Sequence, residues 1–229
     1  MAEHYLYFPS IGFFLIVANA AAYANKRFHE RMFFKIFVVS LVIFYSFLTV
    51  RQNAYWKDPI TFYARTLHYA PYSKRILMFL AKEYHNRQEY ENAIETYQRA
   101  LGIDPLDKTA YHDLGILYIL TQQYEKARQF LEKALTIDAH YASAYNGLGF
   151  LFIETDRFDQ AIEAFNKALS IDPSFEKAYY NLGVVCFIKG EYAKASRFFQ
   201  KALTLNPEYD LARNGLTYLS RYIEKKWIF

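Results

Sequence analysis

The sequence predicts an all-α protein with an N-terminal two-helix transmembrane hairpin, a right-handed α-solenoid of four helix pairs and a C-terminal capping helix. The solenoid follows from the pattern Tyr-x-x-Leu-Gly, which begins at Tyr111, Tyr145 and Tyr179, each 34 residues after the last. The dipeptide Ala-Leu keeps the same step, beginning at residues 100, 134, 168 and 202. Two patterns that share one period are typical of stacked structural repeats. The hairpin follows from two apolar segments near the N-terminus.

These two segments are almost free of charge. Residues 5–24 contain no charged side chain, and residues 33–50 contain only Lys35. About 20 apolar helical residues are needed to cross roughly 30 Å of hydrocarbon. The segments therefore predict two transmembrane helices within a hairpin of residues 1–52. Two alternatives stay open, namely a cleaved signal peptide at the N-terminus or two buried helices of a soluble core.

The linker between the two segments is basic, and its charge predicts an orientation. It holds Lys26, Arg27, Arg31 and Lys35 against a single acid. An excess of Lys and Arg in a short loop marks the cytoplasmic side of a membrane. The sequence therefore predicts an integral membrane protein whose loop 25–32 is cytoplasmic and whose repeats face a periplasm, a lumen or the exterior.

The net charge of +4 comes from the N-terminal third of the chain. Residues 1–73 carry 7 Lys and Arg against 3 Asp and Glu, whereas residues 74–229 are balanced at 20 against 20. A nucleic-acid-binding domain would show a basic stripe on its surface. The sequence therefore predicts that nucleic acid is not a partner.

One repeat unit, residues 142–172, illustrates the predicted local structure. Two apolar stripes run through it at helical spacing, and each indicates one face of an amphipathic helix. The first stripe is Tyr145, Leu148, Gly149 and Phe152, and the second is Ala161, Phe165 and Ala168. A short polar segment joins them, as an antiparallel helix pair requires. Bulk at Gly149 or Ala161 would push the helices apart, which explains a glycine that costs a helix up to about 1 kcal/mol.

The same reasoning divides the whole chain. Residues 53–73 form a linker and an N-terminal capping helix that ends before Pro71. Helix pairs are predicted at residues 74–107, 108–141, 142–175 and 176–209. Residues 210–229 predict a capping helix, because the last pair would otherwise expose an apolar face. Its outer side is expected to carry Arg213, Arg221, Lys225 and Lys226.

The repeats resemble the tetratricopeptide repeat (TPR), whose pattern is a large residue, Leu-Gly, Tyr, then Ala, an aromatic residue, Ala and Pro. The third copy matches this pattern at Tyr145, Leu148, Gly149, Phe152, Phe158, Ala161, Phe165, Ala168 and Pro173. The departures in other copies are Ala81 for glycine, Ala139 for proline and Cys186 for tyrosine. The resemblance implies a solenoid that binds protein or peptide partners. A single cysteine excludes an intrachain disulfide, and Cys186 is expected to be a buried core residue.

Motifs for chemistry are missing from the sequence. It contains no Gly-rich phosphate loop, no Cys-x-x-Cys and no His-x-x-x-His. We therefore predict no catalytic residue, no cofactor site and no metal site, and hence no enzyme activity for this chain. Asp104, Asp138 and Asp172 also recur at the 34-residue step, but each follows the end of a second helix. Turn or capping chemistry explains them better than an acidic site.

The predicted working surface is the inner face of the solenoid, which is lined by the first helix of each pair. The repeat pattern places on it Arg75, Lys82, His85, His112, Asp113, Ile116, Asn146, Phe150, Lys177, Asn181 and Val184. Asn146 and Asn181 stand out because side-chain amides can bind the N–H and C=O groups of an extended peptide, as some TPR proteins do. The alternative, equally open, is that these are polar residues on a hydrated concave face.

A second resemblance concerns the N-terminal residues. The segment Ala2-Glu3-His4-Tyr5-Leu6-Tyr7-Phe8-Pro9-Ser10 and the later Trp56-Lys57-Asp58 are similar to the transmembrane and TPR-containing protein O-mannosyltransferase-like family of C-type glycosyltransferases. In that family, TPR arrays follow the last membrane helices on the non-cytoplasmic side. His4 departs from the arginine that is more common there. The early acidic loop that carries catalysis in such enzymes has no counterpart in this chain.

Two functions follow from these observations. The first is a membrane-anchored TPR scaffold or adaptor that binds protein or peptide partners on the non-cytoplasmic side. The alternative is the C-terminal, acceptor-binding portion of a multi-pass, polyprenyl-phosphate-sugar-dependent protein O-glycosyltransferase. We favour the first because the catalytic elements of the second are missing from the sequence.

Overall fold

The computed structural model describes residues 36–37, 39–48 and 58–227. The chain divides into two compact units, Met1–Thr61 and Phe62–Phe229. In the first unit, residues 36–37 and 39–48 are helical. In the second, all the described residues belong to helices or to the short turns between them, as the sequence predicts for an all-α chain.

The predicted transmembrane hairpin is wrong as far as the structure describes the chain. Among the described residues, no helix is both long enough and apolar enough to cross a bilayer. The predicted span 5–24 and the loop 25–32 lie outside the described residues. The integral membrane localisation, with the repeats on the non-cytoplasmic side, is corrected with the hairpin on which it depended.

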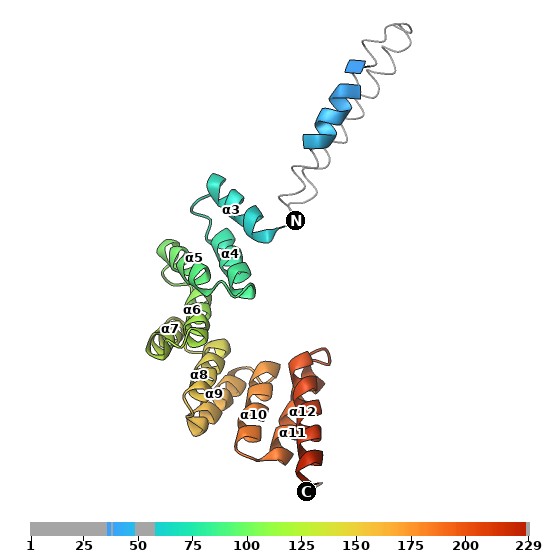
Figure 1. Cartoon of the computed structure of the whole chain (residues 1–229). Coiled ribbons are helices and arrows are strands. Elements are labelled where there is room, and N and C mark those ends of the chain that lie inside the picture. The colour runs from blue at the N-terminus through green and yellow to red at the C-terminus, as the bar shows by residue number, and fades with distance from the viewer. Residues whose placement is uncertain (1–35, 38, 49–57, 228–229) are drawn as a thin grey trace. The chain divides into compact units, whose positions relative to one another are not determined.

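The second unit is a succession of helix pairs (Figure 1). It begins within α3 (Pro59–Tyr69), a short helix in the region where the sequence predicts a capping helix. Four antiparallel pairs follow in the described residues: α4 (Lys74–Asn86) with α5 (Tyr90–Ile103), α6 (Lys108–Leu120) with α7 (Tyr124–Ile137), α8 (Ala142–Glu154) with α9 (Phe158–Ile171), and α10 (Glu176–Ile188) with α11 (Tyr192–Leu205). The chain continues into α12 (Asp210–Trp227), which packs against α11 and α10. The boundaries proposed between repeats stay a prediction.

Glycines allow the two helices of a pair to approach closely. A Cβ atom added at Gly149 on α8 would lie 2.3 Å from the ring of Phe165 on α9. At Gly115 the nearest atom would be Leu131 Cγ at 2.6 Å, and at Gly183 it would be Phe199 Cε1 at 2.6 Å. No real side chain tolerates these distances without a shift of its neighbours. The recurring glycine is therefore required by helix contact, as the sequence predicts.

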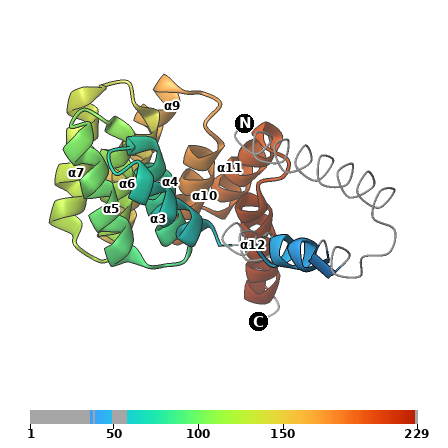
Figure 2. The same ribbon diagram turned by 90° about the horizontal axis from the view of Figure 1, so that it is seen from above.

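The first helices also pack on one another from pair to pair. α6 contacts α8, and α8 contacts α10, so three of the helices predicted to line the inner face lie side by side (Figures 1 and 2). The core between the pairs is apolar, with Leu114, Leu131, Phe165 and Leu182 almost fully buried. Cys186 is buried in this core as well, and burial raises the pKa of its thiol.

The recurring aspartates close the turns that join one pair to the next. Asp104 Oδ1 accepts a hydrogen bond from the Leu106 N–H at 3.2 Å, and Asp138 and Asp172 do the same with the N–H two residues on. This geometry confirms the predicted turn chemistry.

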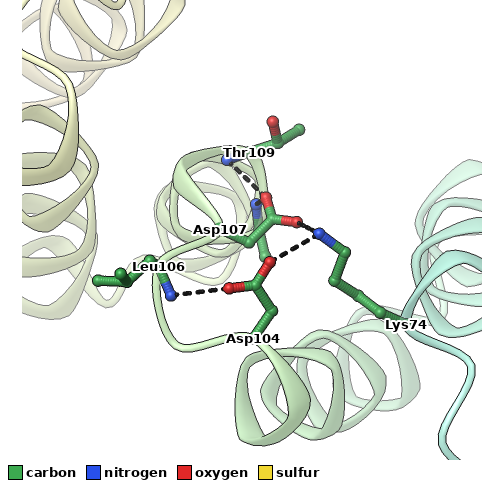
Figure 3. A network of polar contacts seen from close by, with 6 residues as sticks. Lys74, Asp104, Leu106, Asp107 and Thr109 are labelled. Carbon is green, nitrogen blue, oxygen red and sulfur yellow. Dashed lines mark hydrogen bonds and ion pairs between the residues drawn. The ribbon is translucent and has the colours of Figure 1, made fainter.

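A lysine at the start of α4 links the end of α5 to the start of α6 (Figure 3). Lys74 Nζ lies 2.8 Å from Asp104 Oδ2 and 2.8 Å from Asp107 Oδ2. Asp107 is also the N-cap of α6, because its Oδ1 accepts from the Thr109 and Ala110 N–H groups. The hydrogen bond from Lys74 and that from the Leu106 N–H hold the pKa of Asp104 below its ordinary value. Lys108 repeats the arrangement one period later with Asp138.

Removing the charge at Lys74 is expected to give a small, salt-dependent loss of stability. Lys74→Met should lower the midpoint of thermal unfolding by no more than about 4 °C, because exposed ion pairs contribute little. The difference from wild type should shrink in 1 M NaCl. The pKa of Asp104 is lower in the folded protein than in the unfolded chain. The stabilisation by Asp104 is therefore fully present above about pH 4 and is lost as the pH falls through the lowered pKa.

Lys133→Met, at an exposed lysine of α7, is the matched control for this measurement. An equal change of the midpoint in the two variants, or a difference that survives both acid and high salt, would show that the ion pairs of Lys74 do not contribute.

Candidate functional site

The eleven residues predicted to line the inner face come from α4, α6, α8 and α10, and they differ in exposure. Arg75, Lys82 and Lys177 are exposed. Partly buried are His85, His112, Asp113, Ile116, Asn146, Phe150, Asn181 and Val184. The structure brings two groups of them together, and the three exposed cations belong to neither group. The Arg75 guanidinium instead lies over the Phe79 ring, 5.7 Å from its centroid.

The first group surrounds the carboxylate of Asp113 on α6. Tyr97, which is buried on α5, donates its hydroxyl to Asp113 Oδ2 at 3.0 Å. His112 Nδ1 lies 2.9 Å from Asp113 Oδ1. Burial and the charge of Asp113 raise the pKa of Tyr97 far above its ordinary value, so its hydroxyl keeps the proton that it donates. Both oxygens of Asp113 are thus engaged by side chains of this chain.

Aromatic rings contact the two histidines near this carboxylate. The His112 ring makes an edge contact with Tyr141, with centroids 5.8 Å apart, and Lys108 Nζ lies 4.9 Å from the Tyr141 centroid. His85 makes a similar edge contact with Tyr90. Burial lowers the pKa of His85, against the opposing charge of Asp113. In the described part of the chain, no three His, Cys, Asp or Glu side chains are placed to hold a metal ion.

The second group is a pair of asparagines on neighbouring first helices. Asn181 Nδ2 on α10 donates to Asn146 Oδ1 on α8 at 2.9 Å. This bond fixes the orientation of both amides. It uses one donor of Asn181 and the Oδ1 acceptor of Asn146, which leaves the Asn146 Nδ2 donor and the Asn181 Oδ1 acceptor available for other hydrogen bonds. Each of these two atoms makes no side-chain hydrogen bond to another described residue.

The three apolar residues of the predicted set pack against the hydrophobic core. Ile116 and Phe150 pack against the core formed around Leu114 and Leu117. Val184 packs against the core around Phe199 and Cys186. They are therefore shared between the core and the inner face.

Two features of the site could not be recognised from the inner-face pattern. Tyr97 comes from a second helix, which the pattern leaves out. Phe187, Tyr192, Tyr218 and Tyr222 form a cluster of rings on α10, α11 and α12. A signal for Tyr218 exists, because it lies 34 residues after Val184, which belongs to the predicted set. Extending the repeat period into the capping helix would have identified Tyr218 as a candidate.

A separate hollow of about 370 Å³ lies between α3, α4 and α5. None of the predicted inner-face residues lines it. Its walls are Ala64, Leu67, His68, Leu80, Tyr84, Asn92, Glu95, Thr96 and Arg99. It is open and polar and is not part of the predicted surface.

Comparison with known structures identifies similar folds. The crystal structure of MamA is 29% identical and matches over 69% of this chain and 92% of MamA, with a TM-score of 0.54. The structure of Pseudomonas aeruginosa PilF is 25% identical and matches over 68% of this chain and 70% of PilF, with a TM-score of 0.57. A comparison with curated protein sequences found no match.

Family models agree with these structures. One model, described as tetratricopeptide repeat, matches residues 75–140 and 109–174, and a second model of the same description matches residues 176–209. These matches do not support the resemblance of residues 2–58 to the O-mannosyltransferase-like family. Because the two models together cover more than half of the sequence, the chain belongs to the tetratricopeptide-repeat family.

Proposed function

We propose that this chain is a protein-binding scaffold that holds an extended peptide segment of its partner along the inner face of α6, α8 and α10. The observation that carries the proposal is the orientation of Asn146 and Asn181 by their mutual hydrogen bond. Family membership supports the coarser part, since TPR solenoids present extended surfaces to partners.

The asparagine pair matches the hydrogen-bonding groups of one peptide unit. A backbone carbonyl can accept from Asn146 Nδ2, while a backbone N–H can donate to Asn181 Oδ1. Because the two amides already fix one another at 2.9 Å, little side-chain freedom is lost when the peptide binds. A contact to the backbone gives affinity without selecting particular partner side chains.

The neighbouring residues supply the selective contacts. Successive side chains of an extended peptide point to opposite sides, so alternate ones would face the inner surface. Ile116, Phe150 and Val184 offer partly buried apolar surface to such side chains. Arg75, Lys82 and Lys177 are exposed cations of the predicted surface, whereas the carboxylate of Asp113 is already engaged. These apolar residues therefore favour a peptide with apolar side chains at alternate positions.

This function needs no catalytic residue in the chain, and it does not depend on a membrane. The acceptor-binding arm of a glycosyltransferase is not retained as a second proposal, because neither the family models nor the similar structures support it.

Removing both amides is expected to weaken peptide binding by about 10- to 100-fold, the equivalent of two hydrogen bonds at roughly 1 kcal/mol each. A displayed library of random 12-residue peptides, selected on the wild-type protein, supplies the probes. Fluorescence anisotropy then compares their Kd for the wild type and for Asn146→Ala/Asn181→Ala. Circular dichroism checks that both proteins keep the same helix content.

The matched control is Asn166→Ala, which removes an exposed amide from the second helix α9. Its affinity for the selected peptides is expected to equal that of the wild type. If every selected peptide binds Asn146→Ala/Asn181→Ala as tightly as the wild type, the asparagine pair is a structural contact and the proposed peptide site is refuted.

A further inference from the structure

The outward face of α12 carries more apolar surface than a capping helix needs. Leu211, Tyr218 and Tyr222 are 53%, 61% and 39% exposed, whereas Ala212 and Leu219 of the same helix are buried. The end of a solenoid is normally covered by a polar outer face. Contiguous exposed apolar side chains with polar neighbours are typical of an interaction surface.

Two of these side chains belong to a ring cluster that spans three helices, here called the aromatic shelf. It consists of Phe187 on α10, Tyr192 on α11, and Tyr218 and Tyr222 on α12. The Phe187 centroid lies 5.5 Å from that of Tyr218 and 5.3 Å from that of Tyr222, both in edge contact. Tyr222 also lies 5.5 Å from Tyr192. Because each ring contacts at least one other, the shelf is fixed before any partner arrives.

Basic side chains border the aromatic shelf on the same face of α12. Tyr218, Arg221, Tyr222 and Lys225 follow one another at i, i+3, i+4 and i+7, so they share one side of the helix. Arg221 and Lys225 are exposed, and neither has an ion-pair partner among the residues that the structure describes. We call these two residues the basic rim.

The C-terminal end of the chain is also basic as a whole. Residues 189–229 carry 8 Lys and Arg against 4 Asp and Glu, whereas residues 74–188 carry 12 against 16. The helix α11 contributes Lys194, Arg197 and Lys201 and contains no acid. Residues 74–229, which are neutral in total, therefore consist of an acidic part, residues 74–188, and a basic end, residues 189–229.

We propose that the aromatic shelf and the basic rim form a second docking site, which takes an acidic amphipathic segment of a partner protein. Its apolar side chains pack on Tyr218 and Tyr222, and its carboxylates pair with Arg221 and Lys225. Charge complementarity selects this occupant, because a basic segment would meet unpaired cations of the same sign. The site uses no residue of the asparagine pair, so this proposal can be tested independently of the inner-face peptide site.

The test uses a displayed library of random 16-residue peptides, selected on the full chain. A class of selected peptides is expected to be rich in Asp and Glu and to contain Leu, Phe or Trp. These peptides should bind Tyr218→Ser/Tyr222→Ser at least about tenfold more weakly, because exposed aromatic residues dominate such contacts. They should bind Asn146→Ala/Asn181→Ala as tightly as the wild type.

A charge-reversal variant tests the basic rim without disturbing the rings. Arg221→Glu/Lys225→Glu is expected to lose the acidic peptides and to select basic ones instead. Lys133→Glu/Lys167→Glu changes the net charge equally at exposed sites on α7 and α9, and it should retain the acidic peptides. This comparison separates a local contact from the overall charge of the protein.

Three results would overturn the proposal. One is that no selected peptide loses affinity in either α12 variant. Another is self-association in analytical ultracentrifugation that requires Tyr218 and Tyr222, which would make a second copy the occupant. The last is binding to phosphatidylserine-containing vesicles that both α12 variants abolish, with no peptide class dependent on them.

Discussion

Replacing Gly149 by leucine is expected to unfold the solenoid around α8 and α9. The added Cβ would lie 2.3 Å from Phe165 Cε1 and 2.6 Å from two further ring atoms. The Phe165 ring is fully buried, so any shift of the ring has to displace its core neighbours. We expect a loss of at least about 3 kcal/mol, the upper end for overpacked cores, measured by urea unfolding with circular dichroism.

Gly102 supplies the matched control for this substitution. It lies within α5, and a Cβ atom added there meets nothing within 4 Å. Gly102→Ala is therefore expected to stabilise the protein by up to about 1 kcal/mol, since alanine is the better helix former. Equal stability of Gly149→Leu and wild type would mean that α8 and α9 are not in close contact at this point.

Removing the ring on the other side of the same contact is expected to be equally damaging. Phe165→Ala leaves a cavity in the core beside Leu182 and Val185 and should cost about 3–5 kcal/mol of unfolding free energy. The double variant Gly149→Leu/Phe165→Ala places new bulk where the ring was. It is expected to be more stable than the sum of the two single losses predicts, by about 1 kcal/mol or more.

Chemical unfolding of the four proteins measures this coupling directly. Strictly additive losses would show that Gly149 and Phe165 act through different neighbours, which would contradict the packing described for α8 and α9. A non-additive result would locate the closest approach of the pair at these two residues.

The sequence predicts the helix pairs well because their determinants are local. The glycine at 115, 149 and 183 and the large side chain that faces it lie 16 residues apart within one unit, at Leu131, Phe165 and Phe199. Their spacing is therefore visible in a single copy of the repeat. The turn aspartates are predictable for the same reason, because each bonds to an N–H two residues away.

Contacts between units could not be predicted in the same way. The Tyr97 hydroxyl of the first helix pair donates to Asp113 of the second pair. Asn181 donates to Asn146, which lies 35 residues earlier in the chain. Whether such side chains meet depends on how one pair stacks on the next, which the repeat pattern does not specify. The inner-face pattern thus identified both asparagines as candidates but not the bond that orients them.

The transmembrane hairpin illustrates a different limit. The stretch 33–50, with Lys35 as its single charged residue, satisfies the composition of a membrane span, but composition does not set where a helix begins and ends. Among the residues that the structure describes, no helix combines the necessary length with the necessary apolar character. An apolar composition alone was therefore not sufficient to predict a membrane-spanning helix.

The lysine contacts at the turns distinguish the first two repeats from the last two. Lys74 and Lys108 each form an ion pair, here called a clip, that joins the start of one of the first two repeats to the turn at its end. One and two periods further on, alanine stands at residue 142 and glutamate at 176, and neither can form this clip to the turn at Asp172 or Asn206. The asparagine pair and the aromatic shelf both lie in the unclipped half. In that half, successive repeats are joined by other polar contacts, namely the ion pair of Lys189 with Asp159 and the bond between Asn181 and Asn146. A partner that displaces the asparagine bond would therefore remove one of the contacts between the third and fourth repeats.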